Sequence, residues 1–143
     1  MHYRNLQITD HQDLIVLWRN CDGISLRDAD SRHGMQKYLE RNPGLSFVAE
    51  ADARIVASLM AGHDGRRGYI QHLAVDPEQR NQGIAGRLLE LCLQALRAQG
   101  IVKSHVHVLN SNQPGRDFWS RRGWVHRDEI EMYSFINGDN ENT

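Results

Sequence analysis

The spacing of apolar and polar residues along the chain predicts four helices. Apolar residues three and four positions apart share one face of a helix, so their recurrence marks a buried stripe. Thr9 and Asp10 precede the first helix with side-chain oxygens suited to its N-cap, and Gly100 follows the third as a C-terminal cap. The predicted helices lie around Leu14 to Cys21, around Met35 to Leu39, over residues 82–99 and over residues 112–122.

Alternating or continuous apolar runs, bounded by Gly, Pro, Asn or Asp, predict the strands. Asp52 and Ala53 separate two of these runs by two residues, which fits an antiparallel hairpin, and residues 63–68 form a second turn. The predicted strands cover residues 3–8, 45–51, 54–62, 69–75, 101–110 and 130–136, and a polar tail follows at residues 137–143.

The order of these elements predicts a single mixed α/β domain over residues 1–136. A sheet packed by helices accounts for the apolar faces of all the predicted elements. A chain of 143 residues buries roughly two-thirds of the surface that it exposes when unfolded, which is enough for one core.

Composition narrows the classes of partner. The chain has 17 basic and 18 acidic side chains, so we expect neither nucleic acid nor a membrane as its partner. No apolar run approaches the roughly 18 residues of a membrane span, and residues 1–5 lack the apolar core of a secretion signal, which predicts a cytoplasmic protein. Cys21 and Cys92 lie in apolar helical patterns without CxxC spacing, which favours buried free thiols.

The stretch over residues 73–86 predicts a strand, a tight loop and a helix start. Asp76 ends the strand, and the small residues Gly83 and Gly86 open an apolar helix and let a ligand approach the backbone. The first N–H groups of a helix lack internal partners, and the helix dipole is positive at that end. A diphosphate is therefore the expected ligand, with Arg80 beside it.

Two blocks of this sequence resemble the GNAT family of N-acetyltransferases. The loop matches the acetyl-coenzyme A signature R/QxxGxG/A, and Asn112 is followed at the family's spacing by Trp119, Gly123 and Trp124. The first block consists of Leu73, Ala74, Val75, Asp76 and Pro77, followed by Arg80, Asn81, Gln82, Gly83, Ile84, Ala85 and Gly86. With the order of the predicted strands, the resemblance covers nearly the whole chain.

The resemblance implies an α/β (α+β) fold with a GNAT-like sheet, mixed but mostly antiparallel. About 6–7 strands, splayed between the fourth and fifth, and about four helices are expected. Acetyl-coenzyme A is the implied cosubstrate, with its pyrophosphate on the loop from Arg80 to Ala85. Its pantetheine arm would pair with the backbone of Leu73 to Val75 like an added strand, and Asn112 would contact the same arm.

Two positions depart from the family's pattern. Asn81 stands where the family usually has Gly, and Asn tolerates left-handed backbone better than most residues. Trp119 stands where many relatives have a tyrosine that protonates the departing thiolate, and an indole N–H is not a practical acid. Trp119 is expected to pack in the core or against the pantetheine arm, while Tyr69, Tyr133 or water could supply the proton.

An amine attacks a thioester only in its neutral form, so a proton acceptor assists the reaction. A lysine-like amine with a pKa of about 10.4 is neutral in roughly one molecule in 2,500 at pH 7, which costs about 4.6 kcal/mol. His72 is the candidate best suited to accept that proton, against the alternative of a surface or packing histidine. His63 and Asp64 are further candidates, and Gln71 could bind the acceptor.

The remaining polar residues give weaker evidence about the acceptor and about metal binding. Asp22, Asp28 and Asp30 form either an acidic lip that attracts a cationic amine or an ordinary solvated loop. His105 and His107 share one strand face at a spacing that zinc accepts, but the sequence offers no evident third ligand, so no metal is expected.

The leading hypothesis is an N-acetyltransferase that moves acetyl from acetyl-coenzyme A to a primary amine in a ternary complex. The acceptor would be a small molecule, a lysine or a protein N-terminus, and a homodimer is expected. The alternative is a non-catalytic acyl-coenzyme A sensor or interaction module, which Trp119 supports. A nucleotide-binding domain is disfavoured because neither GxxxxGK(S/T) nor a full GxGxxG occurs.

Overall fold

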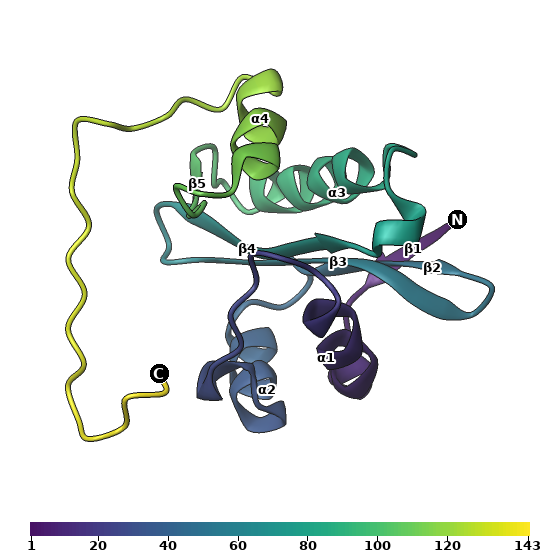
Figure 1. The fold of residues 1–143 in the computed structure, drawn as a ribbon, viewed down its shortest axis with the longest axis horizontal. Coiled ribbons are helices and arrows are strands. Elements are labelled where there is room, and N and C mark those ends of the chain that lie inside the picture. The colour runs from purple at the N-terminus through teal and green to yellow at the C-terminus, as the bar shows by residue number, and fades with distance from the viewer. The chain divides into compact units, whose positions relative to one another are not determined.

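The computed structural model describes residues 1–143 and divides the chain into two compact units, Met1–His107 and Val108–Thr143. The first unit holds the whole β-sheet and three α-helices, and the second holds one α-helix and a long irregular segment (Figure 1). None of the helices combines the length and the apolar character needed to cross a membrane.

The sheet of the first unit has five strands in sequence order, and it is antiparallel except at its last pair. Only β4 and β5 run parallel, because α3 connects them. The strands are β1 (His2–Asn5), β2 (Phe47–Ala51), β3 (Arg54–His63), β4 (Gly68–Val75) and β5 (Ser104–Val106). The prediction of a mixed, mostly antiparallel sheet is confirmed.

The sheet has fewer strands than the resemblance implies, because one alternating segment forms none. Residues 130–136 have no strand structure, and the side chains of Tyr133 and Phe135 are 91% and 88% exposed. The predicted strand over residues 101–110 is reduced to β5, which has 3 residues. Alternation indicates which side chains share a face, but a strand also needs a hydrogen-bonding neighbour, and residues 130–136 have none.

Helices cover both faces of the sheet in the first unit. α1 (His11–Arg19) and α2 (Arg32–Arg41) lie on one face, and α3 (Ile84–Ala98) lies on the other (Figure 1). With α4 of the second unit, the expected four helices are present. Three short 3-10 turns connect these elements, namely η1 (Ile8–Asp10), η2 (Asp28–Asp30) and η3 (Pro77–Gln79).

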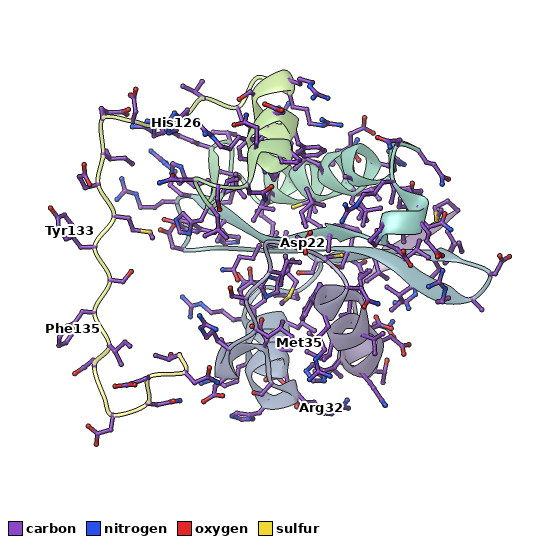
Figure 2. The ribbon with its side chains drawn as sticks, viewed as in Figure 1. Asp22, Arg32, Met35, His126, Tyr133 and Phe135 are labelled. Atoms are coloured by element: carbon purple, nitrogen blue, oxygen red, sulfur yellow. The ribbon has the colours of Figure 1, made fainter.

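The face that carries α1 and α2 holds a continuous hydrophobic core. Leu14 and Trp18 of α1 are fully buried, and Met35 of α2 is 1% exposed and points towards the sheet (Figure 2). Val48 of β2 and Met60 of β3 belong to the same cluster. Because each such side chain contributes about 1.5–3 kcal/mol on burial, the predicted apolar stripes are what hold these helices on the sheet.

Asp10 has a different role from the expected N-cap. Its carboxylate accepts hydrogen bonds from the Gln7 N–H at 2.8 Å and from the Arg4 guanidinium at 2.8 and 2.9 Å, and it does not cap α1. Burial raises the pKa of Asp10, but these hydrogen bonds more than offset it and hold the pKa below its usual value. The predicted strand over residues 3–8 consequently ends at Asn5, where the chain turns into η1.

In the second unit, α4 (Gln113–Arg121) begins at a side-chain cap. Oδ1 of Asn112 accepts the Gly115 N–H at 3.0 Å, and the chain leaves the helix through Gly123, whose φ is +81°. From residue 125 onwards the segment has no helix or strand, and Tyr133 and Phe135 project from it (Figure 2).

Candidate active site

The sheet opens between β4 and β5, and the opening exposes one edge of β4. The two strands pair only from Gly68 with Ser104 to Ile70 with Val106, whereas β3 pairs with β4 as far as Val75. Residues 71–75 therefore have a strand neighbour on one side only. The residues expected to meet the pantetheine arm, Leu73, Ala74 and Val75, lie on this unpaired edge.

A β-bulge interrupts β4 at His72. The pairing with β3 changes register between Ser58 and Met60, and His72 has a φ of +49°, in the left-handed region that is uncommon for residues with a side chain. A buried chain of two hydrogen bonds supports this backbone: Trp18 Nε1 donates to Ser58 Oγ at 2.8 Å, and Ser58 Oγ donates to the His72 carbonyl at 3.1 Å.

The side chain of His72 pairs with a carboxylate from a distant part of the chain. His72 Nε2 lies 2.6 Å from Oδ1 of Asp30, which belongs to η2 between α1 and α2. The Trp18 ring lies against the imidazole, with centroids 4.6 Å apart and planes at 60°. The side chains of His72 and Asp30 are 17% and 13% exposed, so the pair is largely shielded and still open to solvent.

Asp30 is ionised and held by its own surroundings. Its Oδ2 accepts the Arg27 N–H at 2.9 Å, and its carbonyl oxygen lies 2.8 Å from His11 Nε2. Burial raises the pKa of Asp30, but the hydrogen bond from His72 and the backbone hydrogen bond from Arg27 outweigh it, so the pKa is below its usual value.

Asp30 was expected either in an acidic lip or in a solvated loop, and its pairing with His72 was not predicted. No local pattern connects Asp30 with His72, because they are 42 positions apart and belong to different elements. Of the other acids of the predicted lip, Asp22 is exposed and precedes η2, and Asp28 is the first residue of η2.

The loop before α3 has the geometry of a helix entry with open backbone. Asn81 and Gly83 have φ values of +64° and +77°, which explains why an Asn can stand at the first of these positions. The first hydrogen bond of α3 runs from the Arg87 N–H to the Gly83 carbonyl, so the earlier N–H groups of this turn have no partner within the helix. Nothing lies within 4 Å of the position that a Gly83 side chain would take.

Arg80 connects this loop with the end of β4. Its Nε donates to the Val75 carbonyl at 3.2 Å, and the residue itself is exposed. The remaining residues of the predicted cofactor loop follow it in order: Gln82 is exposed before the helix, and Ile84, Ala85 and Gly86 form its first turn. The structure therefore brings the loop and the unpaired edge of β4 together.

The two other residues expected at the cofactor belong to the second unit. The Asn112 side chain caps α4, as described above, and this use of Oδ1 leaves its amide NH₂ available. The Trp119 ring packs against Trp124, with centroids 4.5 Å apart, and against Phe118 at 5.1 Å. Packing accounts for the Trp119 side chain in this unit, while a contact with the pantetheine arm stays a prediction.

The other candidate proton acceptors, His63 and Asp64, form hydrogen bonds within the fold. His63 Nε2 lies 2.8 Å from Gln99 Oε1, and Asp64 accepts two backbone N–H groups of its own turn. No group of three or more His, Cys, Asp or Glu side chains is arranged to hold a metal ion. Cys21 and Cys92 are free and buried, as predicted, and burial raises the pKa of Cys92 to about 12.

The family of this chain follows from its sequence over most of its length. The profile of the acetyltransferase (GNAT) family matches residues 11–124. The chain belongs to this family, and the prediction of a GNAT-type acetyltransferase is confirmed. The match spans α1 to α4 and therefore includes the bulge of β4 and the loop before α3.

Solved structures of acetyltransferases share the fold. An aminoglycoside 6'-N-acetyltransferase from Acinetobacter haemolyticus has a TM-score of 0.77 at 16% identity, over 96% of this chain and 100% of that one. PaiA N-acetyltransferase from Thermoplasma acidophilum, in complex with coenzyme A, has a TM-score of 0.74 at 20% identity, over 85% of this chain and 87% of that one. A predicted acetyltransferase with acetyl-CoA from Clostridium acetobutylicum has a TM-score of 0.74 at 20% identity, over 93% and 95%.

Proposed function

We propose that this protein transfers the acetyl group of acetyl-coenzyme A to a primary amine within a ternary complex. The observation that carries the proposal is the unpaired edge of β4 over residues 71–75, which begins beside His72 and ends at the loop before α3. An extended ligand adds to such an edge through backbone hydrogen bonds, and a diphosphate binds at a helix start. One strand thus connects a proton acceptor with an anion site.

The residues proposed to hold the cosubstrate come from three places in the chain. The edge of β4 supplies Leu73, Ala74 and Val75, and the second unit supplies Asn112 and Trp119. The loop supplies Arg80, Asn81, Gln82, Gly83, Ile84, Ala85 and Gly86. The open N–H groups before Arg87 and the left-handed backbone at Gly83 support this assignment, as do the coenzyme A and acetyl-CoA complexes among the similar structures.

His72 is the proposed proton acceptor. When bound, acetyl-coenzyme A supplies a thioester carbonyl that an amine can attack. A neutral amine is required for that attack, so removal of its proton by a nearby imidazole raises the reactive fraction. Backbone N–H groups near Val75 on the unpaired edge would stabilise the negative charge that develops on the carbonyl oxygen.

The departing thiolate needs no strong acid. A thiol with a pKa of about 8.5 leaves as thiolate at a cost of about 2 kcal/mol at pH 7. Trp119 offers no acidic proton, so water or a tyrosine hydroxyl completes the step. Two tyrosines are candidates for this proton donor. Tyr69 belongs to β4, where its hydroxyl lies 3.5 Å from Asp64 Oδ2, and Tyr133 is exposed in the second unit.

The acceptor is proposed to be a small-molecule amine. An open pocket includes Gln71, the residue before His72, and its other lining residues are Tyr38, Arg41, Asn42, Gly62, His63, Asp64 and Tyr69. Similar structures include aminoglycoside acetyltransferases, one of them in complex with a bisubstrate analogue of coenzyme A and acetylneamine. Asp64 and the hydroxyl and amide groups of this pocket suit an amine that carries hydroxyl groups. A lysine or a protein N-terminus is the second candidate.

Two measurements test the proposed function. Acetyl-coenzyme A should raise the melting temperature, because a ligand that binds only the folded state stabilises it. Release of free thiol should then be followed across a panel of aminoglycosides, polyamines, simple primary amines and peptides with free N-termini or lysines. A thermal shift together with thiol release from at least one amine is the expected result.

The outcomes separate the competing hypotheses. A thermal shift without thiol release from any amine would favour the acyl-coenzyme A sensor or interaction module. An unchanged melting temperature would contradict both the enzyme and the sensor. Faster release of free thiol with peptides than with small molecules would indicate that the acceptor is a protein.

We also propose that the protein forms a homodimer in which residues 130–136 of one copy pair with β5 of the other. β5 has a strand neighbour on one side only, and Tyr133 and Phe135 are almost fully exposed. Burial of such side chains contributes about 25 cal/mol for each Å² removed from water. Light scattering should give a dimer for the wild type and for Ser134→Asp, and a monomer for Tyr133→Asp combined with Phe135→Asp; a monomeric wild type would contradict it.

A single acetyltransferase domain over residues 1–136, a polar tail over residues 137–143 and a cytoplasmic location remain predictions from the sequence. Limited proteolysis tests the first two, because a single domain resists cleavage on both sides of residue 107 while the tail is removed.

A further inference from the structure

We infer that Asp30 is a positioning residue that makes Nδ1 of His72 the atom which accepts the proton of the attacking amine. The inference rests on the proposed function for its chemistry, but its central claim, the protonation pattern of the His72 ring, can be measured without any substrate. It concerns a pair that no local sequence pattern indicated.

The Asp30 carboxylate determines the tautomer of the neutral His72 ring. A neutral imidazole carries one N–H, and the nitrogen that donates it is set by the partner on that side. Asp30 is ionised and can only accept, and its Oδ1 lies 2.6 Å from His72 Nε2. The N–H must therefore sit on Nε2, which leaves the lone pair on Nδ1.

Asp30 itself is held in a fixed position by its neighbours. Its other oxygen accepts the Arg27 N–H at 2.9 Å, and its carbonyl oxygen is 2.8 Å from His11 Nε2 of α1. α2 closes the other side, because a Cβ at Gly34 would lie 2.4 Å from the Ala29 carbonyl oxygen. Only a glycine permits this approach of α2 to η2, so α1 and α2 both restrain the backbone that carries Asp30.

The His72 ring itself has little freedom. The bulge places its backbone at a φ of +49°, the Ser58 hydroxyl holds its carbonyl, and the Trp18 ring lies 4.6 Å from it. The groups that contact the imidazole are thus Asp30 from η2 and Trp18 from α1, while Ser58 from β3 holds the His72 carbonyl and His11 lies 2.8 Å from the Asp30 carbonyl oxygen. Asp30 is the charged side chain that forms an ion pair with the imidazole.

The reaction balances through this pair. The amine nitrogen forms a bond to the thioester carbonyl carbon, the C–S bond breaks, and its electron pair leaves with the sulfur as thiolate. Before this attack the protonated amine loses one proton to Nδ1, and the resulting imidazolium is stabilised by the Asp30 carboxylate on its Nε2 side. The second proton, which the nitrogen loses as the amide forms, goes to the thiolate or to solvent. The proton on Nδ1 returns to solvent or to the thiolate afterwards.

Nitrogen NMR of histidine-labelled protein tests the tautomer directly. We expect the neutral His72 ring to carry its proton on Nε2 in the wild type, and to lose this preference in Asp30→Ala. Asp13→Ala removes a carboxylate from an exposed position of α1 and serves as the matched control, with the wild-type pattern retained. A wild-type ring protonated on Nδ1, or an unchanged pattern in Asp30→Ala, would overturn the inference. The wild-type spectrum decides this even if Asp30→Ala does not fold.

Kinetics separate a positioning role from a merely structural one. Asp30→Ala should lower kcat at least about tenfold with little change in KM for acetyl-coenzyme A, since the carboxylate acts on the proton acceptor and not on the cofactor loop. In a His72→Gln background, Asp30→Ala should have no further effect. The same loss in both backgrounds would contradict the inference. Failure of the proposed function is a different result, namely no thermal shift with acetyl-coenzyme A in the wild type.

Discussion

The loop before α3 and the cluster around His72 are built in opposite ways, although both adjoin the same strand. The loop offers backbone N–H groups, and its shape depends on the left-handed residues Asn81 and Gly83 within one short segment. The cluster offers side chains from three elements, since Asp30 comes from η2, Trp18 from α1 and Ser58 from β3. The loop is a local structure, and the cluster exists only when the sheet and helices have packed.

This difference determines what a substitution does in each region. Backbone groups keep their chemistry when a side chain changes, so the loop is sensitive only to bulk, charge or a lost positive φ. In the cluster each side chain is a partner of another, so one change leaves a neighbour unsatisfied. Three predictions test the contrast, and a fourth tests the buried carboxylate of Asp10, which lies outside both regions.

Gly83→Glu should have the largest effect on cosubstrate binding. Its carboxylate would stand at the helix start where the diphosphate is proposed to bind, and a side chain is strained at a φ of +77°. We expect the affinity for acetyl-coenzyme A to fall at least about 100-fold. At a ligand concentration of 100 times the wild-type Kd, the stabilisation by ligand would fall from about 2.7 to about 0.4 kcal/mol, measured as a lost thermal shift.

Gly100→Glu is the matched control for that experiment. Gly100 follows the other end of α3, with a φ of +81° and nothing within 4 Å of the position that a Cβ would take. The same strain and the same charge are thus introduced away from the loop. A thermal shift that survives in Gly83→Glu, or is lost equally in both variants, would contradict the anion site.

His72→Gln should lower kcat by roughly 10²- to 10³-fold while KM for acetyl-coenzyme A stays unchanged, because general base catalysis typically contributes 10²–10⁴. Glutamine can still hydrogen-bond with Asp30 but cannot take a proton at neutral pH. The loss should be largest below about pH 8, where most of the amine is protonated. Steady-state kinetics against pH measure it, and His33→Gln, at an exposed position of α2, should behave like the wild type. Equal pH profiles for the two variants would rule out His72 as the general base.

Ser58→Ala should lower the free energy of unfolding by about 1–3 kcal/mol, because Trp18 Nε1 and the His72 carbonyl would both lose a buried partner. Urea denaturation measures the change. Ser120→Ala, at an exposed position of α4, should stay within about 0.5 kcal/mol of the wild type. If Ser58→Ala is equally neutral, the hydrogen-bond chain does not support the bulge.

Asp10→Asn should have the smallest effect, about 1 kcal/mol, and it should depend on pH. The pKa of Asp10 in the folded protein lies below the unfolded value of 3.8, so its stabilisation is complete above that pH and is lost as pH falls through the folded value. Melting curves from neutral to acid pH should show the wild type and the variant converging. Asp13→Asn is the exposed control, and a constant difference across the pH range would refute the role of the carboxylate.

Particular residues show how far sequence reasoning reached. Asn81 and Gly83 were expected in a tight loop and have left-handed backbone, and Asn112 caps the last helix at the position where its helix was predicted to begin. These features depend on the residue and its immediate neighbours. Residues 130–136 show the limit, because their side chains alternate as a strand's would but no neighbouring strand is available to pair with them.

The sequence by itself determined the family, the order of the elements as far as α4 and the loop before α3, because local backbone preferences and apolar periodicity are properties of short segments. Only the tertiary structure decided that Asp30 meets His72, that Ser58 and Trp18 support the bulge and that β4 keeps an unpaired edge. These contacts join residues that are distant in the chain, and their geometry arises when the sheet, α1 and η2 pack together.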